Sequence, residues 1–354
     1  MAMSALRNLV GEVIGGRWVV EAPMGVGGTS TGGAFSKPYR VKEISTGRNA
    51  FLKVIDLVSA LTNQYSGLPV HEAIRRVTDN HAFEVFLAET CRDKKMTRVV
   101  HALDSGEISI PVPALGNLQF PYIVFEHAEH GDVHTLLDVN QNLGVLWKLQ
   151  VLHQVATAMQ QLHAAEIAHQ DVKRSNVVFF ESNDGRLTDL GRAVMKNYPS
   201  RNDLRDVPCQ NQNAAPELLY GRVSNEWGQR HLATDLYMLG NLAFTLFFNV
   251  TMTSSILGRL PPNILPFPNA VNYGNVLPAL QAALDDILRD IEQQIPQTFR
   301  KQYIECLRLL CQPDPDLRGH PLDHAKASGN RYSVQRFISL FDLMRQREAL
   351  KLMR

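Results

Sequence analysis

The chain has 354 residues, of which 45% are hydrophobic and 20% are charged. This is the composition of an ordinary globular protein, and it excludes extensive disorder. The net charge is only +1, from 36 basic and 35 acidic side chains, so no global field would attract nucleic acid or an anionic membrane. Any such partner would need a local patch, and we expect no nucleic acid partner.

The sequence gives no sign of a disulfide framework, a zinc site or a membrane span. The four cysteines form no C-x-x-C pair. Residues 1–16 lack the basic start and long apolar core of a signal peptide. The longest apolar run, residues 237–250, is interrupted by polar residues and is too short to cross a bilayer, so it predicts a buried core helix. We therefore expect a cytoplasmic protein.

A glycine-rich stretch at residues 25–33 follows a predicted strand at 18–20. Glycines can bring backbone N–H groups close to phosphate oxygens, because no Cβ obstructs the approach. The glycines concerned are Gly25, Gly27, Gly28, Gly32 and Gly33. A flexible hairpin turn is the alternative reading of this stretch taken alone.

The next segments predict a small sheet with one helix. β-Branched residues bounded by turn formers indicate strands at four places, and apolar periodicity indicates a helix. The strands are expected at residues 40–44, 50–55, 98–107 and 121–126, and the helix at residues 82–91. Residues 57–80 read as an insertion that holds a short helix at 71–76.

From residue 133 the pattern becomes helical. Apolar residues recur at spacings of three and four between Leu149 and Leu162, which predicts an amphipathic helix. The stretch after it, residues 169–176, places a carboxylate, a lysine and an amide at fixed offsets. Asp171 can accept a proton from a hydroxyl, Lys173 can neutralise a phosphoryl group, and Asn176 can offer an oxygen to a metal ion. A turn with incidental polar residues is the alternative.

A second carboxylate, Asp189, follows a short strand and a polar turn. Together the two stretches resemble the catalytic loop and the metal-binding motif of eukaryotic-like, Hanks-type serine/threonine protein kinases, H-R-D-x-x-x-x-N followed by D-F-G. Gln170 replaces the arginine of the first motif, and Leu190 replaces the phenylalanine of the second. The compact build is similar to that of soluble, prokaryote-type relatives of these kinases.

Further motifs of the family occur in the family's order. They are Lys53 on its strand, Ala215-Pro216-Glu217, the segment from Asp235 to Gly240, and Arg318. The resemblance implies that Glu217 forms a structural ion pair with Arg318 and that Asp235 braces the backbone of the catalytic loop.

The resemblance implies an α+β, two-lobed protein kinase fold. A small lobe, residues 1–126, would hold an antiparallel sheet and one helix, and residues 127–132 would form the hinge. Residues 133–330 would form a large, mainly helical lobe. Residues 331–354 form a basic amphipathic helix, which is expected to pack against the large lobe, although docking to a partner or to a membrane surface is also open.

The resemblance also implies an ATP site. Lys53 would hold the α and β phosphates, and the glycine stretch, enlarged by about six residues, would cover them. The carbonyl of Glu126 and the N–H of Ala128 would bind the adenine edge, and Asp132 would reach the ribose. Phe51 stands where the family has a small alanine against adenine, so the shape of the adenine pocket is expected to differ.

An active kinase needs a glutamate that pairs with the strand lysine. Glu84 is favoured, because Leu87 and Ala88, one turn further, can face inward. Glu89 and Glu72 remain alternatives, and a solvated helix face is the ordinary fate of each.

The resemblance implies transfer of the γ-phosphoryl group of ATP to a serine or threonine of a protein substrate. Asp171 would accept the proton, Asp189 and Asn176 would hold Mg²⁺, and Lys173 would offset charge on the transferred group. Gln170 carries no positive charge for an activation-loop phosphate, so we expect activity without phosphorylation of that loop. A pseudokinase that acts as a binding module and a small-molecule phosphotransferase are the alternatives. Phosphorylation of Thr29, Ser30 or Thr31 in the glycine stretch would place charge against ATP and inhibit the enzyme, and unmodified hydroxyls in a polar turn are the alternative.

Overall fold

A computed structural model describes most of the chain. The described residues are 6, 9–25, 36–61, 67–112, 116–140, 143–181, 183–198, 202, 209, 211–267, 271–326 and 329–353. The chain divides into two compact units. Unit 1 comprises Met1–Gly131, Phe179–Glu181 and Thr188–Gly191, and unit 2 comprises Asp132–Val178, Ser182–Leu187 and Arg192–Arg354.

Unit 1 contains a six-stranded antiparallel sheet in the order β1-β2-β3-β4-β6-β5. Its strands are β1 (Val13–Ile14), β2 (Trp18–Pro23), β3 (Ser36–Glu43), β4 (Asn49–Ile55), β5 (Ala102–Val112) and β6 (Gly116–Glu126). The turn between β3 and β4 requires a left-handed residue, and Gly47 supplies it with φ of 73°. Trp18, Val41 and Leu52 are fully buried in the hydrophobic core that packs against the sheet. This explains why buried residues alternate with more exposed ones along β2 to β4.

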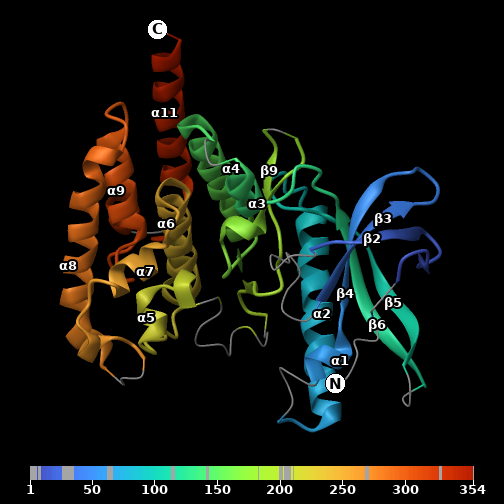
Figure 1. Ribbon diagram of the computed structural model, residues 1–354. Coiled ribbons are helices and arrows are strands. Elements are labelled where there is room, and N and C mark those ends of the chain that lie inside the picture. The colour runs from blue at the N-terminus through green and yellow to red at the C-terminus, as the bar shows by residue number, and fades with distance from the viewer. Residues whose placement is uncertain are drawn as a thin grey trace. The chain divides into compact units, whose positions relative to one another are not determined.

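Among the described residues of unit 1, the helices α1 (Leu57–Ser59) and α2 (Val70–Asp93) accompany this sheet. The expectation of two separate helices at 71–76 and 82–91 is wrong, because α2 runs through both without a break. Asp79 and Asn80 are poor helix formers. The helix continues across them because Val77 and Phe83 belong to one buried face, which packs against β5 and β6. Figure 1 shows α2 as one long helix beside the sheet.

The β5–β6 hairpin is longer than the sequence indicates. The strand expected at 98–107 begins later, at Ala102, and continues to Val112, and its partner already begins at Gly116. Pro111 and Gly116 lower the strand propensity of this extension. Cross-strand pairing, such as that of Ile110 with Leu118, nevertheless continues to the end of the ladder, so pairing overrides local preference.

Unit 2 is mainly helical. Its helices are α3 (Val133–Val139), α4 (Val145–Ala164), α5 (Pro216–Leu219), α6 (Ala233–Phe248), α7 (Met252–Leu257), α8 (Tyr273–Ile291), α9 (Arg300–Leu310), α10 (Pro321–His324) and α11 (Gln335–Leu352). Short two-stranded sheets join β7 (Ile167–Ala168) to β10 (Val194–Met195) and β8 (Val177–Phe179) to β9 (Gly185–Leu187). The single-turn helices are η2 (Arg174–Asn176), η4 (Asn211–Asn213), η5 (Gly228–Leu232), η6 (Pro262–Ile264) and η7 (Glu292–Gln294).

Helix α6 is the core of unit 2. All its residues from Ala233 to Leu246 are buried, as expected for a helix that is apolar on every side. It contacts α4, α7 and α9 (Figure 1). Asn249, with φ of 55°, ends it in the left-handed conformation.

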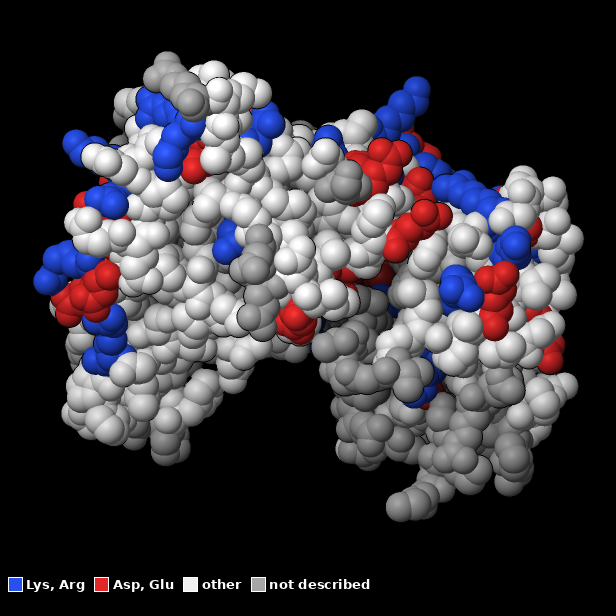
Figure 2. Space-filling view, turned by 45° about the horizontal axis from the view of Figure 1, so that its top comes forward, with Lys and Arg blue, Asp and Glu red and all other residues white. Residues whose placement is uncertain are grey.

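The last helix packs within unit 2. Phe337, Phe341 and Met344 on α11 are fully buried, and α11 contacts α4 and α9. The expected packing of this basic helix is therefore observed. No helix in the described part of the chain is long and apolar enough to cross a membrane. On the face drawn in Figure 2, the described Lys and Arg atoms are interspersed with Asp and Glu atoms.

Candidate active site

Lys53 lies at the centre of a buried charge cluster in unit 1. Its Nζ donates to Oε1 of Glu84 at 2.7 Å and to Oδ1 of Asp189 at 3.3 Å. The side chains of Lys53 and Glu84 are only 8% and 6% exposed, and that of Asp189 is 18% exposed. Strand β4 positions the lysine, and the buried face of α2 positions Glu84 beside Leu87 and Ala88.

The structure separates the three glutamates that the sequence offered as partners of Lys53. Glu84 forms the ion pair. Glu72 instead bonds to Arg75 and Arg76 on its own helix. Glu89 is exposed. Glu84 pairs with Lys53 because it lies on the buried face of α2. Its position one turn before Leu87 and Ala88 predicts this.

The pKa of Lys53 is raised above its ordinary value. Burial alone would lower it, but the carboxylates of Asp189 and Glu84 outweigh burial. The ammonium is therefore held in its charged form. A permanent positive charge at this place suits a lysine that binds phosphate oxygens.

Asp189 adopts a backbone conformation that non-glycine residues rarely use, with φ of 65°. Its Oδ1 accepts the long 3.4 Å hydrogen bond from the N–H of Gly191 as well as the bond from Lys53. Such conformations cost about 1–3 kcal/mol and persist only where surrounding contacts hold them. Lys53 and Gly191 are two of those contacts.

Only the first residue of the glycine-rich stretch is described. Gly25 follows β2 with φ of 78°. The remaining members that the sequence assigns to phosphate binding, Gly27, Gly28 and Gly33, lie outside the described residues. So do the hydroxyls at 29–31 and most of the segment between 199 and 210.

The segment expected to bind adenine leaves β6 at Glu126. Ala128 follows it, and within the described residues its backbone N–H has no hydrogen-bond acceptor, which fits the role that the resemblance gives it. Phe51 packs against Phe125, with ring centroids 6.5 Å apart. Asp132, which the resemblance assigns to the ribose, uses its carboxylate to cap α3, where Oδ1 accepts from the N–H of Thr135 at 2.8 Å.

Asp171 lies in unit 2, on the loop between β7 and η2. Its side chain is 3% exposed. Oδ2 is held by Nζ of Lys173 at 2.9 Å and by Nδ2 of Asn176 at 3.3 Å. Oδ1 is buried and has no hydrogen-bond donor among the described residues. One oxygen is therefore fixed, and the other has no donor in the part of the chain that the structure describes.

Asn176 also ties the loop to itself. Its Nδ2 donates to the backbone carbonyl of Asp171 at 2.8 Å. Because the amide nitrogen makes these bonds, the amide oxygen remains outside them. The arrangement thus fits a metal ligand at this residue.

Arg192 is a site residue that the sequence reading missed. Its Nε lies 3.7 Å from Oδ2 of Asp171. The available signal was its position directly after Asp189-Leu190-Gly191. It gives Asp171 a second cation beside Lys173.

Asp235, on α6, supports the backbone of the loop that carries Asp171. Its carboxylate accepts from the backbone N–H of His169 and of Gln170, each at 2.8 Å, and from Nε2 of His163 at 2.8 Å. Burial opposes the charged form, but the hydrogen bond from His163 and further interactions outweigh it, so the pKa of Asp235 lies below its usual value. This is the bracing role that the resemblance gives to Asp235.

Gln170 turns inward. Its Nε2 donates to the carbonyl of His231 at 2.9 Å and to Oδ1 of Asp235 at 3.0 Å. The residue is 2% exposed and has a left-handed φ of 64°. These two bonds hold the Gln170 side chain inside unit 2.

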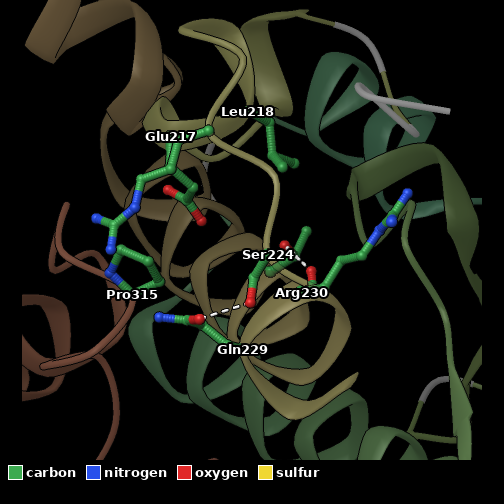
Figure 3. Close-up of a pocket in the computed structure, with 8 residues that line it drawn as sticks. Glu217, Leu218, Ser224, Gln229, Arg230 and Pro315 are labelled. Atoms are coloured by element: carbon green, nitrogen blue, oxygen red, sulfur yellow. Dashed lines mark hydrogen bonds between the residues drawn. The ribbon is translucent and has the colours of Figure 1, made fainter. Parts of the chain in front are cut away.

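Glu217 and Arg318 form a bidentate ion pair in unit 2. The two hydrogen bonds are 2.7 and 2.8 Å long, and the arginine side chain is fully buried. A small pocket beside Glu217 (Figure 3) is also lined by Ser224, Gln229 and Pro315. Its volume of about 10 Å³ leaves room for about one water molecule, so it is no nucleotide site.

Comparison with known proteins agrees with the resemblance of the sequence motifs to those of protein kinases. A family model described as the protein kinase domain matches residues 31–319. The hormonally up-regulated neu tumor-associated kinase of Mus musculus is 23% identical over 284 residues, which are 80% of this chain and 33% of that protein. Its homolog B in Xenopus laevis is 24% identical over 273 residues, 77% of this chain and 36% of the relative.

A shorter match was also found. The probable serine/threonine-protein kinase FMP48 of Saccharomyces cerevisiae is 28% identical over 145 residues, which are 36% of this chain and 38% of that protein. The chain thus spans about a third of the length of the curated relatives it matches.

Proposed function

The chain belongs to the protein kinase family, and from that premise we propose that it transfers the γ-phosphoryl group of ATP to serine or threonine hydroxyls of a protein substrate. The observation that carries the proposal is Asp171. One of its oxygens is fixed by Lys173 and Asn176, and the other is buried with no donor in the described chain. A buried acceptor left open in this way suits the hydroxyl proton of a substrate.

In the proposed reaction the substrate oxygen attacks the γ-phosphorus. The new P–O bond forms as the bond to the bridging β,γ oxygen breaks, and ADP leaves with the electron pair. Asp171 orients the hydroxyl and takes its proton late in the step. Lys173 offsets negative charge on the transferred group, and catalysis rests mostly on positioning and electrostatics.

Nucleotide binding is proposed for the residues that the resemblance assigns to it. Lys53, fixed by Glu84, would bind the α and β phosphates, and Gly25 begins the stretch that would cover them. The backbone of Glu126 and Ala128 would bind adenine. Asp189 and the amide oxygen of Asn176 would hold Mg²⁺, which would offset the negative charge of the phosphates.

The acceptor residue can be tested directly. Incubation with radiolabelled ATP and Mg²⁺ in the presence of mixed protein substrates should label phosphoserine and phosphothreonine. Lys173 supports this choice, because tyrosine kinases that resemble this loop usually lack lysine at that offset. Label on tyrosine alone would contradict the proposal.

A pseudokinase is the second candidate. Phe51, packed against Phe125 where the family has alanine, is the observation that favours it. Nucleotide binding measured by calorimetry, together with the absence of any transfer to protein, would establish this alternative.

The ion pair of Lys53 provides one prediction. Glu84→Gln removes the charge that fixes Lys53. Because the lysine is then no longer held in place to bind the phosphates, kcat/KM is expected to fall by about ten- to a hundredfold. Glu89→Gln on the exposed side of the same helix is the matched control and should stay within about twofold. Equal effects of the two changes would argue against the role of Glu84.

The environment of Gln170 provides a second prediction. Because its side chain is neutral and bonded to His231 and Asp235, activity is expected not to depend on activation-loop phosphorylation. Phosphatase treatment of the purified protein, followed by a transfer assay, should leave the rate within about twofold. If the treatment abolished activity and rephosphorylation within residues 192–213 restored it, this prediction would fail.

A further inference from the structure

The side chain of Arg192 approaches Asp171 from the residues that precede β10. Its Nε lies 3.7 Å from Oδ2 of Asp171, the same oxygen that accepts hydrogen bonds from Lys173 and Asn176. At this separation the contact is an ion pair without a hydrogen bond. The mechanism proposed above gives Arg192 no step, although its charge lies beside the base.

The pairing of two short strands places Arg192 at this position. In the antiparallel sheet of β7 with β10, Val194 pairs with Ala168. The chain therefore enters β10 at the same end at which it leaves β7 toward Asp171. Ala193 and Val194 are fully buried, at 0% and 1% exposure, and they fix the backbone next to Arg192. The contact of Arg192 with Asp171 is thus built into the fold of unit 2.

The two cations beside Asp171 differ in their access to water. Among the described residues, Lys173 and Arg192 form ion pairs with Asp171, whose side chain is 3% exposed. The side chain of Lys173 is 20% exposed, and that of Arg192 is 35% exposed. Longer distance and greater exposure both weaken an ion pair. Lys173 is therefore the main support of the carboxylate in this structure, and Arg192 is the weaker one.

The proposed reaction gives Lys173 two tasks. Its Nζ holds Oδ2 of Asp171 at 2.9 Å, and it also offsets charge on the transferred phosphoryl group. An ammonium that turns toward a phosphoryl oxygen moves away from the carboxylate, so its attraction for the carboxylate falls. Asp171 would then be less firmly held at the moment when it must accept the proton. A misplacement of about 1 Å can cost about a hundredfold in rate.

We propose that Arg192 is a positioning residue that keeps Asp171 in place while Lys173 turns to the transferred phosphoryl group. Nε of Arg192 approaches Oδ2 as Lys173 withdraws, and Oδ1 stays directed at the substrate hydroxyl. Arg192 acts through Asp171 and touches neither nucleotide nor substrate. The inference rests on the proposed kinase activity and deepens it.

Single substitutions give the first test. Arg192→Gln removes the charge and should lower kcat by about three- to tenfold, with KM for ATP and for the protein substrate within about twofold. Arg192→Lys keeps a cation and should retain kcat within about twofold of the wild type. Thermal unfolding of both variants should match the wild type. A merely structural role would lower the unfolding temperature and would not be rescued by lysine.

Arg345→Gln is the matched control. The Arg345 side chain is 38% exposed and pairs with Asp342 at 2.7 Å on α11, so the substitution removes a similarly exposed charge that has no part in the proposed site. Equal effects of Arg192→Gln and Arg345→Gln on kcat would overturn the proposal. A higher KM for the protein substrate at unchanged kcat would also overturn it, because that result would place Arg192 on the substrate.

A double-mutant cycle tests whether the two cations share one task. Lys173→Ala is expected to lower kcat by about a hundredfold. In that background Arg192 is the remaining ion-pair partner of Asp171 in the described chain. Arg192→Gln should therefore lower kcat by a factor at least about three times larger than it does in the wild type. The same factor in both backgrounds would overturn the shared role.

The activity of the wild type separates this inference from the proposed function. If the wild type transfers phosphate and Arg192→Gln matches it, the proposed function stands and the positioning role of Arg192 is overturned. If the wild type binds ATP but transfers no phosphate, the proposed function fails, and the positioning role falls with it.

Discussion

Asp171→Asn is expected to lower the rate of phosphoryl transfer by about a thousandfold, with unfolding and nucleotide binding little changed. Removal of a general base costs about 10²–10⁴ in rate. Asparagine keeps the shape of the side chain, so the bonds from Lys173 and Asn176 retain an oxygen acceptor. The position of the open oxygen is then taken by the amide nitrogen, which cannot accept a proton.

The measurement is incorporation of radiolabelled phosphate, compared with thermal unfolding and with the affinity for ATP. Asp138→Asn, at a carboxylate of unit 2 that is 58% exposed, is the matched control and should transfer phosphate like the wild type. An Asp171→Asn protein that retained more than about a tenth of the wild-type rate would exclude Asp171 as the base.

Arg318→Met should destabilise the protein by about 3–5 kcal/mol, because it leaves the carboxylate of Glu217 buried without its cation. That side chain is 4% exposed, so water cannot replace the arginine. Urea unfolding monitored by circular dichroism would give the free energy. The loss should exceed that of any single change at an exposed ion pair.

Two further proteins separate the charge effect from the packing effect. Arg259→Met breaks an exposed pair with Asp290 of the same 2.7 Å length and should cost at most about 1 kcal/mol. Adding Glu217→Leu to Arg318→Met removes the stranded charge and should restore part of the stability. If Arg318→Met cost no more than Arg259→Met, the buried pair would not stabilise this fold.

The sequence predicts those parts of the molecule in which local pattern and long-range packing agree. Strand β4, helix α4 and the buried helix α6 follow from their periodicity, and Lys53 and Glu84 lie where their strand and helix faces place them. The break expected between residues 77 and 81 does not occur, since the buried face of α2 outweighs the low helix propensity of Asp79 and Asn80. Propensity is a weak guide when tertiary contacts oppose it.

Other features depend on chain segments that only folding brings together. The contact of Arg192 with Asp171 joins positions with no common sequence pattern. Asp132 shows a different limit, because one carboxylate can suit a ribose contact or a helix cap, and spacing alone cannot distinguish the two. The structure shows the cap.

The packing of α11 on α4 has a consequence for synthesis of the chain. Helix α4 leads into the loop that carries Asp171, yet the helix that covers it, Gln335–Leu352, is made much later. Contacts between such distant segments form slowly. The side of α4 that α11 contacts should therefore stay uncovered until α11 emerges from the ribosome, and during that interval the nascent chain should be a substrate for chaperones.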